Sequence, residues 1–461
     1  KPERDVKNAL DKLNKASHQA EVDANKAYWD YIIDNTPEKQ AKLNEKEEKC
    51  NNFYNNEILQ EKLLHFSSKA ELDEVLENFN NFKSEETNAD KDYEKLSKLE
   101  NDVQTKANKF SNPEGVAYRN YISKDIVKLV NARNDYAKKK GYENFYEMKL
   151  AEQGKDSKKL DSMFEKIADA TKNVENNKKS ISSETIKLIA SRLGKNNILG
   201  LCADIYKDMG WNIMDMPIKS FDLFPRENKI NSRQTNSIDP NNDVRVLADL
   251  DIENAPLFSV STLMHELGHA VHYSSFGENL PITQKTITSE TMDEGIALLM
   301  GSLAEKEGTL AKTLGLPESA AQEIKDASLL SKVDNIRAYI QVDRFEKAMY
   351  ENPNQDLNKL WKDCGKKYNN YRYSSLEWTD IDHFIHSPAY YHFYVEGEVM
   401  AEQLYNAASK GGKVKLTETK DTAKFFNNIF KYGSSKNEDE ILKQVTGKTL
   451  DVDAYCKQFR A

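Results

Sequence analysis

The sequence has few cysteines, and their positions exclude the usual cysteine-based sites. Only 4 cysteines occur among 461 residues, at Cys50, Cys202, Cys364 and Cys456. No two of them form a CxxC pair, so neither a cysteine zinc site nor a dithiol redox motif is present. We expect them to be buried or incidental, since disulfides between distant cysteines cannot be deduced from a sequence.

Two further absences limit the classes of partner. Lys and Arg total 66 against 75 Asp and Glu, a net charge of −9, so no basic field is available to hold nucleic acid. No apolar run approaches the roughly 18 residues that cross a bilayer, and the apolar stretch at residues 295–304, GIALLMGSLA, is too short. We therefore expect no nucleic-acid partner and no membrane span.

Helical periodicity dominates the chain, and internal repeats are absent. Residues 1–110 are dense in charge but keep apolar positions at helical spacing, which predicts an N-terminal helical subdomain acting as a lid or wall; disorder is the alternative. The sequence Asn112-Pro113-Glu114-Gly115 breaks the pattern. Residues 111–461 are predicted to form one integrated catalytic region.

One stretch has the texture of strands. Ile230–Ile238 and Val244–Leu250 are joined by a turn-forming sequence at Asp239–Asp243, which predicts a small antiparallel hairpin. An edge strand of this kind can bind an extended peptide through its backbone groups. A purely structural hairpin is the equally weighted alternative.

The sequence His265-Glu266-Leu267-Gly268-His269 follows the hairpin and matches the pattern HExxH. On a helix, the i, i+4 spacing places both imidazoles on one face, where they can bind zinc. The glutamate between them can then act on a water molecule. With only 8 histidines in the chain, a chance match has a probability on the order of 1 in 100.

A zinc peptidase needs a third protein ligand, commonly from a following helix. The candidates are Glu290, Asp293 and Glu294 in the apolar helix expected at Ser289–Glu307. Glu290 and Glu294 lie one turn apart on the same face, so helical geometry leaves both open. Asp293 is expected to point elsewhere.

The histidines form two groups that account for 6 of the 8. They are His265, His269 and His272, and His383, His386 and His392. We interpret this as two distant segments that converge on one site. The alternative for the second group is an aromatic core helix whose histidines have hydrogen-bond partners.

The segment around the HExxH pattern resembles that of a known family. The segment HELGHAVHYSSF at residues 265–276, with its additional His272, is similar to the zinc helix of the thimet oligopeptidase and oligoendopeptidase F family, relatives of angiotensin-converting enzyme. The segments NARNDYAKKKGYENFYE, FDLFPRENK and HFIHSPAYYHFYVEG also resemble this family. The similarity extends from about Tyr118 to Leu404.

The resemblance implies one zinc ion per chain, held by His265, His269 and Glu294, the glutamate 25 residues past the second histidine. Glu266 is then the general base. The resemblance also implies that Tyr394 is the oxyanion donor, with His383 beside it. His386 is a possible replacement for His383. The expected substrate-contacting residues are Tyr391, His386 and His272.

The resemblance further implies a mainly α, multi-helical, two-lobed peptidase with a deep central cleft and a small antiparallel hairpin beside the zinc. Two departures stand out. The position that supplies a carboxylate to a zinc histidine in angiotensin-converting relatives is Leu298, and a lysine that grips the substrate's terminal carboxylate would fall near Asp382, an acid. We therefore expect an oligoendopeptidase rather than a dipeptidyl carboxypeptidase.

Two other hypotheses remain in view. A non-catalytic peptide-binding protein could retain the fold, although the intact motifs favour an enzyme. An aminopeptidase on another zinc scaffold would use a nearer glutamate, about where Glu290 lies. We expect short peptides as substrates, a monomer, and an exported rather than cytoplasmic protein, because the chain begins with Lys1 and not Met.

Overall fold

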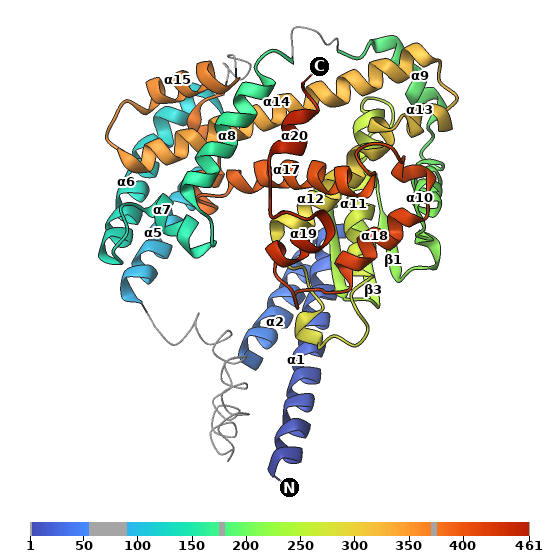
Figure 1. Ribbon diagram of the computed structural model, residues 1–461. Coiled ribbons are helices and arrows are strands. Elements are labelled where there is room, and N and C mark those ends of the chain that lie inside the picture. Colours follow the sequence, from blue (N-terminus) through green and yellow to red (C-terminus); the bar gives the residue numbers. More distant parts are fainter. Residues whose placement is uncertain (1, 55–89, 175–179, 370–375, 461) are drawn as a thin grey trace. The chain divides into compact units, whose positions relative to one another are not determined.

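The structure is a computed structural model that describes residues 2–54, 90–174, 180–369 and 376–460. Helices dominate these residues, and the strands among them form one small sheet (Figure 1). The prediction of a mainly α fold with a small antiparallel hairpin is thus confirmed. The chain divides into two compact units, the first made of residues 1–88, 182–321 and 407–447, the second of residues 89–181, 322–406 and 448–461.

The first unit contains the sheet and the helices around it. Its strands are β1 (Ile218–Asp222), β2 (Gln234–Asp239) and β3 (Asp243–Leu247). Its α-helices are α1 (Pro2–Ile33), α2 (Pro37–Tyr54), α9 (Ser183–Arg192), α10 (Ile198–Met209), α11 (Pro256–Tyr273), α12 (Glu290–Lys306), α13 (Thr309–Thr313), α18 (Asp421–Phe430) and α19 (Glu438–Thr446). Short 3-10 helices lie at Ile213–Asp215, Ile282–Gln284 and Leu416–Glu418.

The sheet has the strand order β1-β3-β2. β2 and β3 form the predicted antiparallel hairpin, and Asn241 in its turn takes the left-handed conformation with φ of 66°. β1 pairs in parallel with β3 and was not predicted, because its five residues show no apolar alternation. β2 is an edge strand, and its Ile238 joins Trp29 and Ile32 of α1 in a small apolar cluster.

The second unit is helical in the residues described. Its elements are α5 (Lys91–Asn108), α6 (Gly115–Lys139), α7 (Phe145–Glu152), α8 (Ser157–Thr171), α14 (Glu318–Glu351), α15 (Leu357–Asn369), α16 (His383–His386), α17 (Tyr391–Ala408), α20 (Asp453–Lys457) and a 3-10 turn at Trp378–Asp380. The first residues of α14 and the last of α17 are grouped with the first unit. The core includes Phe164, Phe345, Phe384 and Trp378, all fully buried.

The described residues test the predicted N-terminal subdomain only in part, and they do not test the predicted domain boundary. Residues 55–89 of the predicted N-terminal helical subdomain lie outside the described residues, while α1, α2 and α5 are helices as expected. The division at residue 110 and the central cleft between two lobes stay predictions. All four cysteines are free. No helix in the described segments combines the length and the hydrophobicity needed to cross a membrane.

Candidate metal centre

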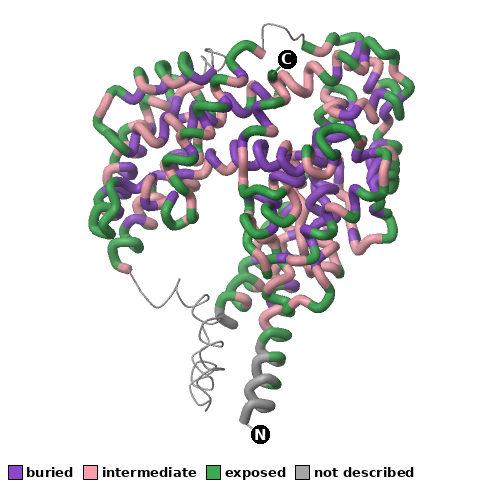
Figure 2. The backbone as a smooth tube through the Cα atoms, viewed as in Figure 1, coloured by how far each residue is buried: buried purple, intermediate pink, exposed green. Residues whose placement is uncertain are grey.

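The candidate centre is built on two buried helices of the first unit, α11 and α12. Helix α11 begins at Pro256, a residue favoured in the first turn of a helix. The Ser289 side chain caps α12 by accepting a hydrogen bond from the backbone N–H of Met292. Both helices are mostly buried, as the purple tube in Figure 2 shows. They pack side by side.

Two glycines allow these helices to approach closely. A Cβ added to Gly268 on α11 would lie 3.0 Å from the Met300 Cβ, and one added to Gly301 on α12 would lie 3.1 Å from the His265 Cβ. Such separations are tighter than ordinary van der Waals contact. The small residues therefore set the distance between the helices and, with it, the distance between the side chains that α11 and α12 direct at each other.

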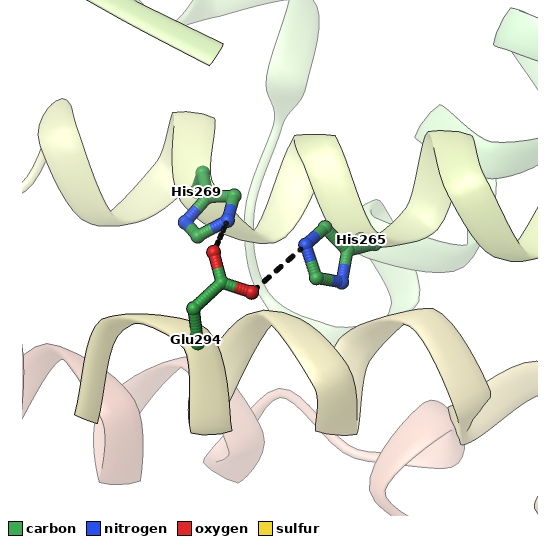
Figure 3. A group of neighbouring side chains, drawn as sticks. All are labelled: His265, His269 and Glu294. Carbon is green, nitrogen blue, oxygen red and sulfur yellow. Dashed lines mark ion pairs between the residues drawn. The ribbon is translucent and has the colours of Figure 1, made fainter. Parts of the chain in front are cut away.

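His265 and His269 on α11 point toward Glu294 on α12 (Figure 3). The Nε2 atom of His265 lies 3.5 Å from one Glu294 carboxylate oxygen, and Nε2 of His269 lies 3.1 Å from the other. One donor atom from each residue falls within 4.8 Å of the other two. Glu290, the alternative third ligand, is exposed and lies outside this group.

The donor set fits a zinc ion. Zinc–ligand bonds of about 2.0–2.2 Å in tetrahedral geometry separate neighbouring donors by roughly 3.3 Å. The two contacts, 3.1 and 3.5 Å to different oxygens of the Glu294 carboxylate, are close to this value, and one donor atom from each of the three residues lies within 4.8 Å of the other two. The Glu294 side chain is 45% exposed while that of His269 is only 7% exposed, so solvent can reach the group from the glutamate side. Three ligands with an open fourth position are typical of catalytic zinc sites.

The two histidines have different electrostatic surroundings. Burial and the neighbouring His269 lower the pKa of His265 to about 4, so its imidazole is neutral, as a metal ligand must be. Burial opposes protonation of His269, but the carboxylates of Asp293 and Glu294 outweigh it and raise its pKa. A cation between the side chains would take the place of that proton.

Glu266 lies between the two histidines on α11 and is 5% exposed. The hydroxyl of Thr235 on β2 donates to its carboxylate over 2.7 Å, and so the edge strand fixes the carboxylate's orientation. Burial raises the pKa of Glu266, partly offset by His269 and by the Thr235 hydroxyl. A carboxylate with a raised pKa is suited to general-base work near neutral pH. The sequence offered no signal for Thr235, because the contact spans 31 positions between a strand and a helix.

Asp293 lies beside the ligand group, in a position that the sequence did not specify. It is not in the ligand triangle, but its carboxylate lies 3.0 Å from Nδ1 of His269 and accepts a hydrogen bond from the Tyr273 hydroxyl over 2.8 Å. A metal-ligating histidine usually donates its other ring N–H to a carboxylate. Asp293 therefore provides the carboxylate that Leu298 cannot. This preference of zinc histidines for a carboxylate partner could have identified Asp293 from the sequence, since Asp293 is the acid adjacent to the expected third ligand.

His272, expected to contact substrate, is buried in the first unit. Its ring stacks on Phe430 with centroids 4.4 Å apart, and only 4% of the residue is exposed. Its Nδ1 atom lies 3.3 Å from Asp293. These contacts support a packing role beside the helix pair, and a contact between His272 and substrate stays a prediction.

The other expected residues come together in the second unit. Nε2 of His383 on α16 lies 3.0 Å from the hydroxyl of Tyr394 on α17. The Tyr391 ring stands edge-on to His383, with centroids 4.9 Å apart, and burial raises the pKa of its phenol. Asp382 lies 3.0 Å from Nδ1 of His383 and 3.3 Å from Nε2 of His386. His392 is instead fully buried and paired with Glu396, as the core alternative predicted for a single histidine.

The backbone of α16 is held by a buried arginine. Arg133 on α6 donates to the backbone carbonyls of Phe384 and Ile385, and Glu100 balances its charge at 2.7 Å. Downstream, the backbone N–H of Ala389 donates to the carboxyl group of Glu346. Burial raises the pKa of this carboxyl group to about 8. The backbone that follows His383 is thus held at Phe384, Ile385 and Ala389, which the sequence did not indicate.

The fold resembles that of known peptidases over nearly its whole length. An M32 carboxypeptidase from Deinococcus radiodurans R1 has a TM-score of 0.75 at 12% identity, with 98% of each chain covered. A carboxypeptidase from Pyrococcus furiosus gives 0.74 at 16% identity and 98% of each chain. Metallocarboxypeptidase 1 from Trypanosoma cruzi gives 0.68 at 15% identity, covering 97% of this chain and 98% of the other. Identities this low establish a shared fold alone.

Sequence comparison assigns the family. No curated protein matches the chain. The pattern that describes peptidase family M3, however, matches residues 219–461, more than half of the chain, and this region carries β1 to β3, α11 and α12, and the His383–Tyr394 segment. The resemblance inferred from the zinc helix is therefore confirmed at the level of the family, whereas the oligoendopeptidase F subtype stays a prediction. The chain belongs to peptidase family M3.

Proposed function

We propose that this chain is a zinc-dependent metallopeptidase that hydrolyses peptide bonds in short peptides. The observation that carries the proposal is the grouping of His265, His269 and Glu294, whose ligand atoms lie within 4.8 Å of one another beside the buried carboxylate of Glu266. Membership of family M3 supports a peptidase. One zinc ion per chain is the cofactor that the donor set favours.

A zinc ion held by His265, His269 and Glu294 would polarise the scissile carbonyl as a Lewis acid and would lower the pKa of a water molecule toward about 7. Glu266 accepts a proton from the attacking water and returns it to the leaving amine. Thr235 holds the Glu266 carboxylate in place, and Asp293 keeps the Nδ1 proton of His269 so that Nε2 presents its lone pair.

The developing oxyanion needs a hydrogen-bond donor, and we assign this role to Tyr394. A phenol is neutral at pH 7 and can donate. Its support is the hydrogen-bonding contact with His383, which orients the hydroxyl, together with the resemblance of this segment to oligopeptidases. His386 and Tyr391 are proposed as further substrate contacts.

The position of the cleaved bond in the substrate distinguishes two candidate activities, an endopeptidase and a carboxypeptidase. The sequence favours an endopeptidase acting on oligopeptides, because Asp382 stands where a carboxylate-binding lysine was expected. A carboxypeptidase is the second candidate, favoured by Arg233: this exposed guanidinium lies 4.9 Å from the Phe258 ring, and its charge acts on the His265 imidazole. A cation in that position could hold a terminal carboxylate.

Mass spectrometry of a defined peptide mixture, with free and amidated C-termini and with and without chelator, tests both. Internal cleavage insensitive to amidation supports the endopeptidase, and loss of cleavage on amidation supports the carboxypeptidase. Cleavage that persists with chelator rejects the zinc mechanism. Efficient digestion of a folded protein in the same assay would reject the restriction to short peptides. The monomeric state and the export of the chain stay predictions.

A further inference from the structure

We propose that Asp382, His383 and His386, all residues of the second unit, form a second divalent-cation site. One donor atom from each of the three residues lies within 4.8 Å of the other two. Two imidazoles and one carboxylate are ligands suited to borderline transition metals, of which zinc is the natural probe. None of the three residues belongs to the group His265, His269 and Glu294.

The local chain geometry converges on one point. Asp382 immediately precedes α16, so it lies one residue before His383 and four before His386. Its two carboxylate oxygens lie 3.0 Å from Nδ1 of His383 and 3.3 Å from Nε2 of His386. These separations are close to the roughly 3.3 Å between neighbouring donors around tetrahedral zinc, so binding requires only small side-chain shifts.

Access and rigidity also suit an ion. The Asp382 and His386 side chains are 68% and 43% exposed, so an ion can enter from solvent and water can complete its coordination. The backbone between the ligands is rigid, because Arg133 binds the carbonyls of Phe384 and Ile385. A preorganised backbone lowers the entropy cost of gathering the ligands.

The site would control the contact between His383 and Tyr394. When Asp382 accepts the Nδ1 proton of His383, Nε2 has a lone pair and accepts from the Tyr394 hydroxyl at 3.0 Å. An ion on Nδ1 places the ring proton on Nε2, which then donates to the tyrosine oxygen and directs the phenol's own proton to another acceptor. This consequence rests on the proposed oxyanion role of Tyr394, whereas the site itself does not.

The test counts metal ions in the full-length protein. Equilibrium dialysis of the zinc-loaded chain against increasing Zn²⁺, followed by elemental analysis, should show a second equivalent of zinc. The variants His386→Gln and Asp382→Asn should each lose that equivalent and keep the first, which also reports that they fold. The matched control is His18→Gln, because His18 pairs with Asp239 at 2.9 Å and the two form no three-ligand group with any other described residue; this variant should keep both equivalents.

Metal content rather than turnover is measured, so the result is independent of peptidase activity. An equivalent lost on His269→Gln belongs to the zinc site of the proposed function, and one lost on His386→Gln belongs to the second site. The proposal is overturned if wild type binds no equivalent sensitive to His386, or if Asp382→Asn and His386→Gln bind as much zinc as wild type does.

Discussion

Replacing Asp293 by asparagine should weaken zinc binding without removing any zinc ligand. The carboxylate lies 3.0 Å from Nδ1 of His269 and 2.8 Å from the Tyr273 hydroxyl, and the residue is 7% exposed. Asparagine has the same shape, so its amide oxygen can still accept from Nδ1 while its NH₂ group faces the tyrosine oxygen, which can accept. The change is therefore mainly the loss of a buried negative charge beside the imidazole of His269, a proposed zinc ligand.

The magnitude follows from that difference. A hydrogen bond to a charged group contributes about 1.5–3 kcal/mol and a neutral one about 1 kcal/mol, which leaves a loss of roughly 0.5–2 kcal/mol. Removing the outer partner of a zinc histidine typically costs about 10- to 100-fold in metal affinity, and we expect the lower part of this range.

Competition with a chromogenic chelator at fixed pH measures the affinity. Glu290→Gln is the matched control, because this exposed acid begins the same helix and lies outside the ligand group, and it should bind zinc like wild type. An unchanged zinc affinity in Asp293→Asn would refute the assignment of Asp293 as the partner of His269. A loss in Glu290→Gln would instead point to Glu290 as the third ligand.

Three further predictions follow from the contacts around the two groups. Thr235→Val removes the hydroxyl that orients Glu266, and initial rates should show kcat falling by roughly 10-fold or more at unchanged zinc content, with activity restored in Thr235→Ser. Arg133→Lys replaces the planar guanidinium, whose two terminal nitrogens each reach one carbonyl, with a single ammonium that does not reproduce this fork, so kcat should fall more than KM rises. The control Arg119→Lys, at an ion pair with Glu377, should keep wild-type rates. Burial raises the pKa of Glu346 from 4.5 to about 8, so the folded state holds a proton that the unfolded state releases, and the free energy of unfolding should fall by up to a few kcal/mol as pH rises between these values. Urea unfolding across this range should show a flatter profile for Glu346→Gln; an identical profile would contradict the shift.

The helices and the ligand group could be predicted because their signals are local. The HExxH spacing places His265 and His269 on one face of any helix that contains them, and the apolar runs of α11 and α12 predict two buried helices. Local sequence could not decide whether Glu290 or Glu294 is the third ligand, because both lie on the same helical face. The helix crossing at Gly268 and Gly301 is what places Glu294 opposite the histidines.

The supporting residues could not be predicted, because their partners are distant in sequence. Thr235 reaches Glu266 only after β2 packs on α11, and Arg133 reaches the α16 carbonyls across 251 positions. β1 was missed since its pairing with β3 leaves no period in its five residues. Conversely, the grouping of His383, His386 and Tyr394 followed from short spacings that a pair of helices preserves.

The measurement that tests the central claim most directly is the zinc content and peptide turnover of Glu266→Gln in one preparation. The substitution keeps the size of the side chain and the ligands His265, His269 and Glu294, but it removes the group that accepts the proton from water. We predict wild-type zinc content with turnover reduced by roughly 10²–10⁴-fold. Wild-type turnover in this variant would contradict the mechanism, and wild-type protein that binds no zinc would contradict the metal centre itself.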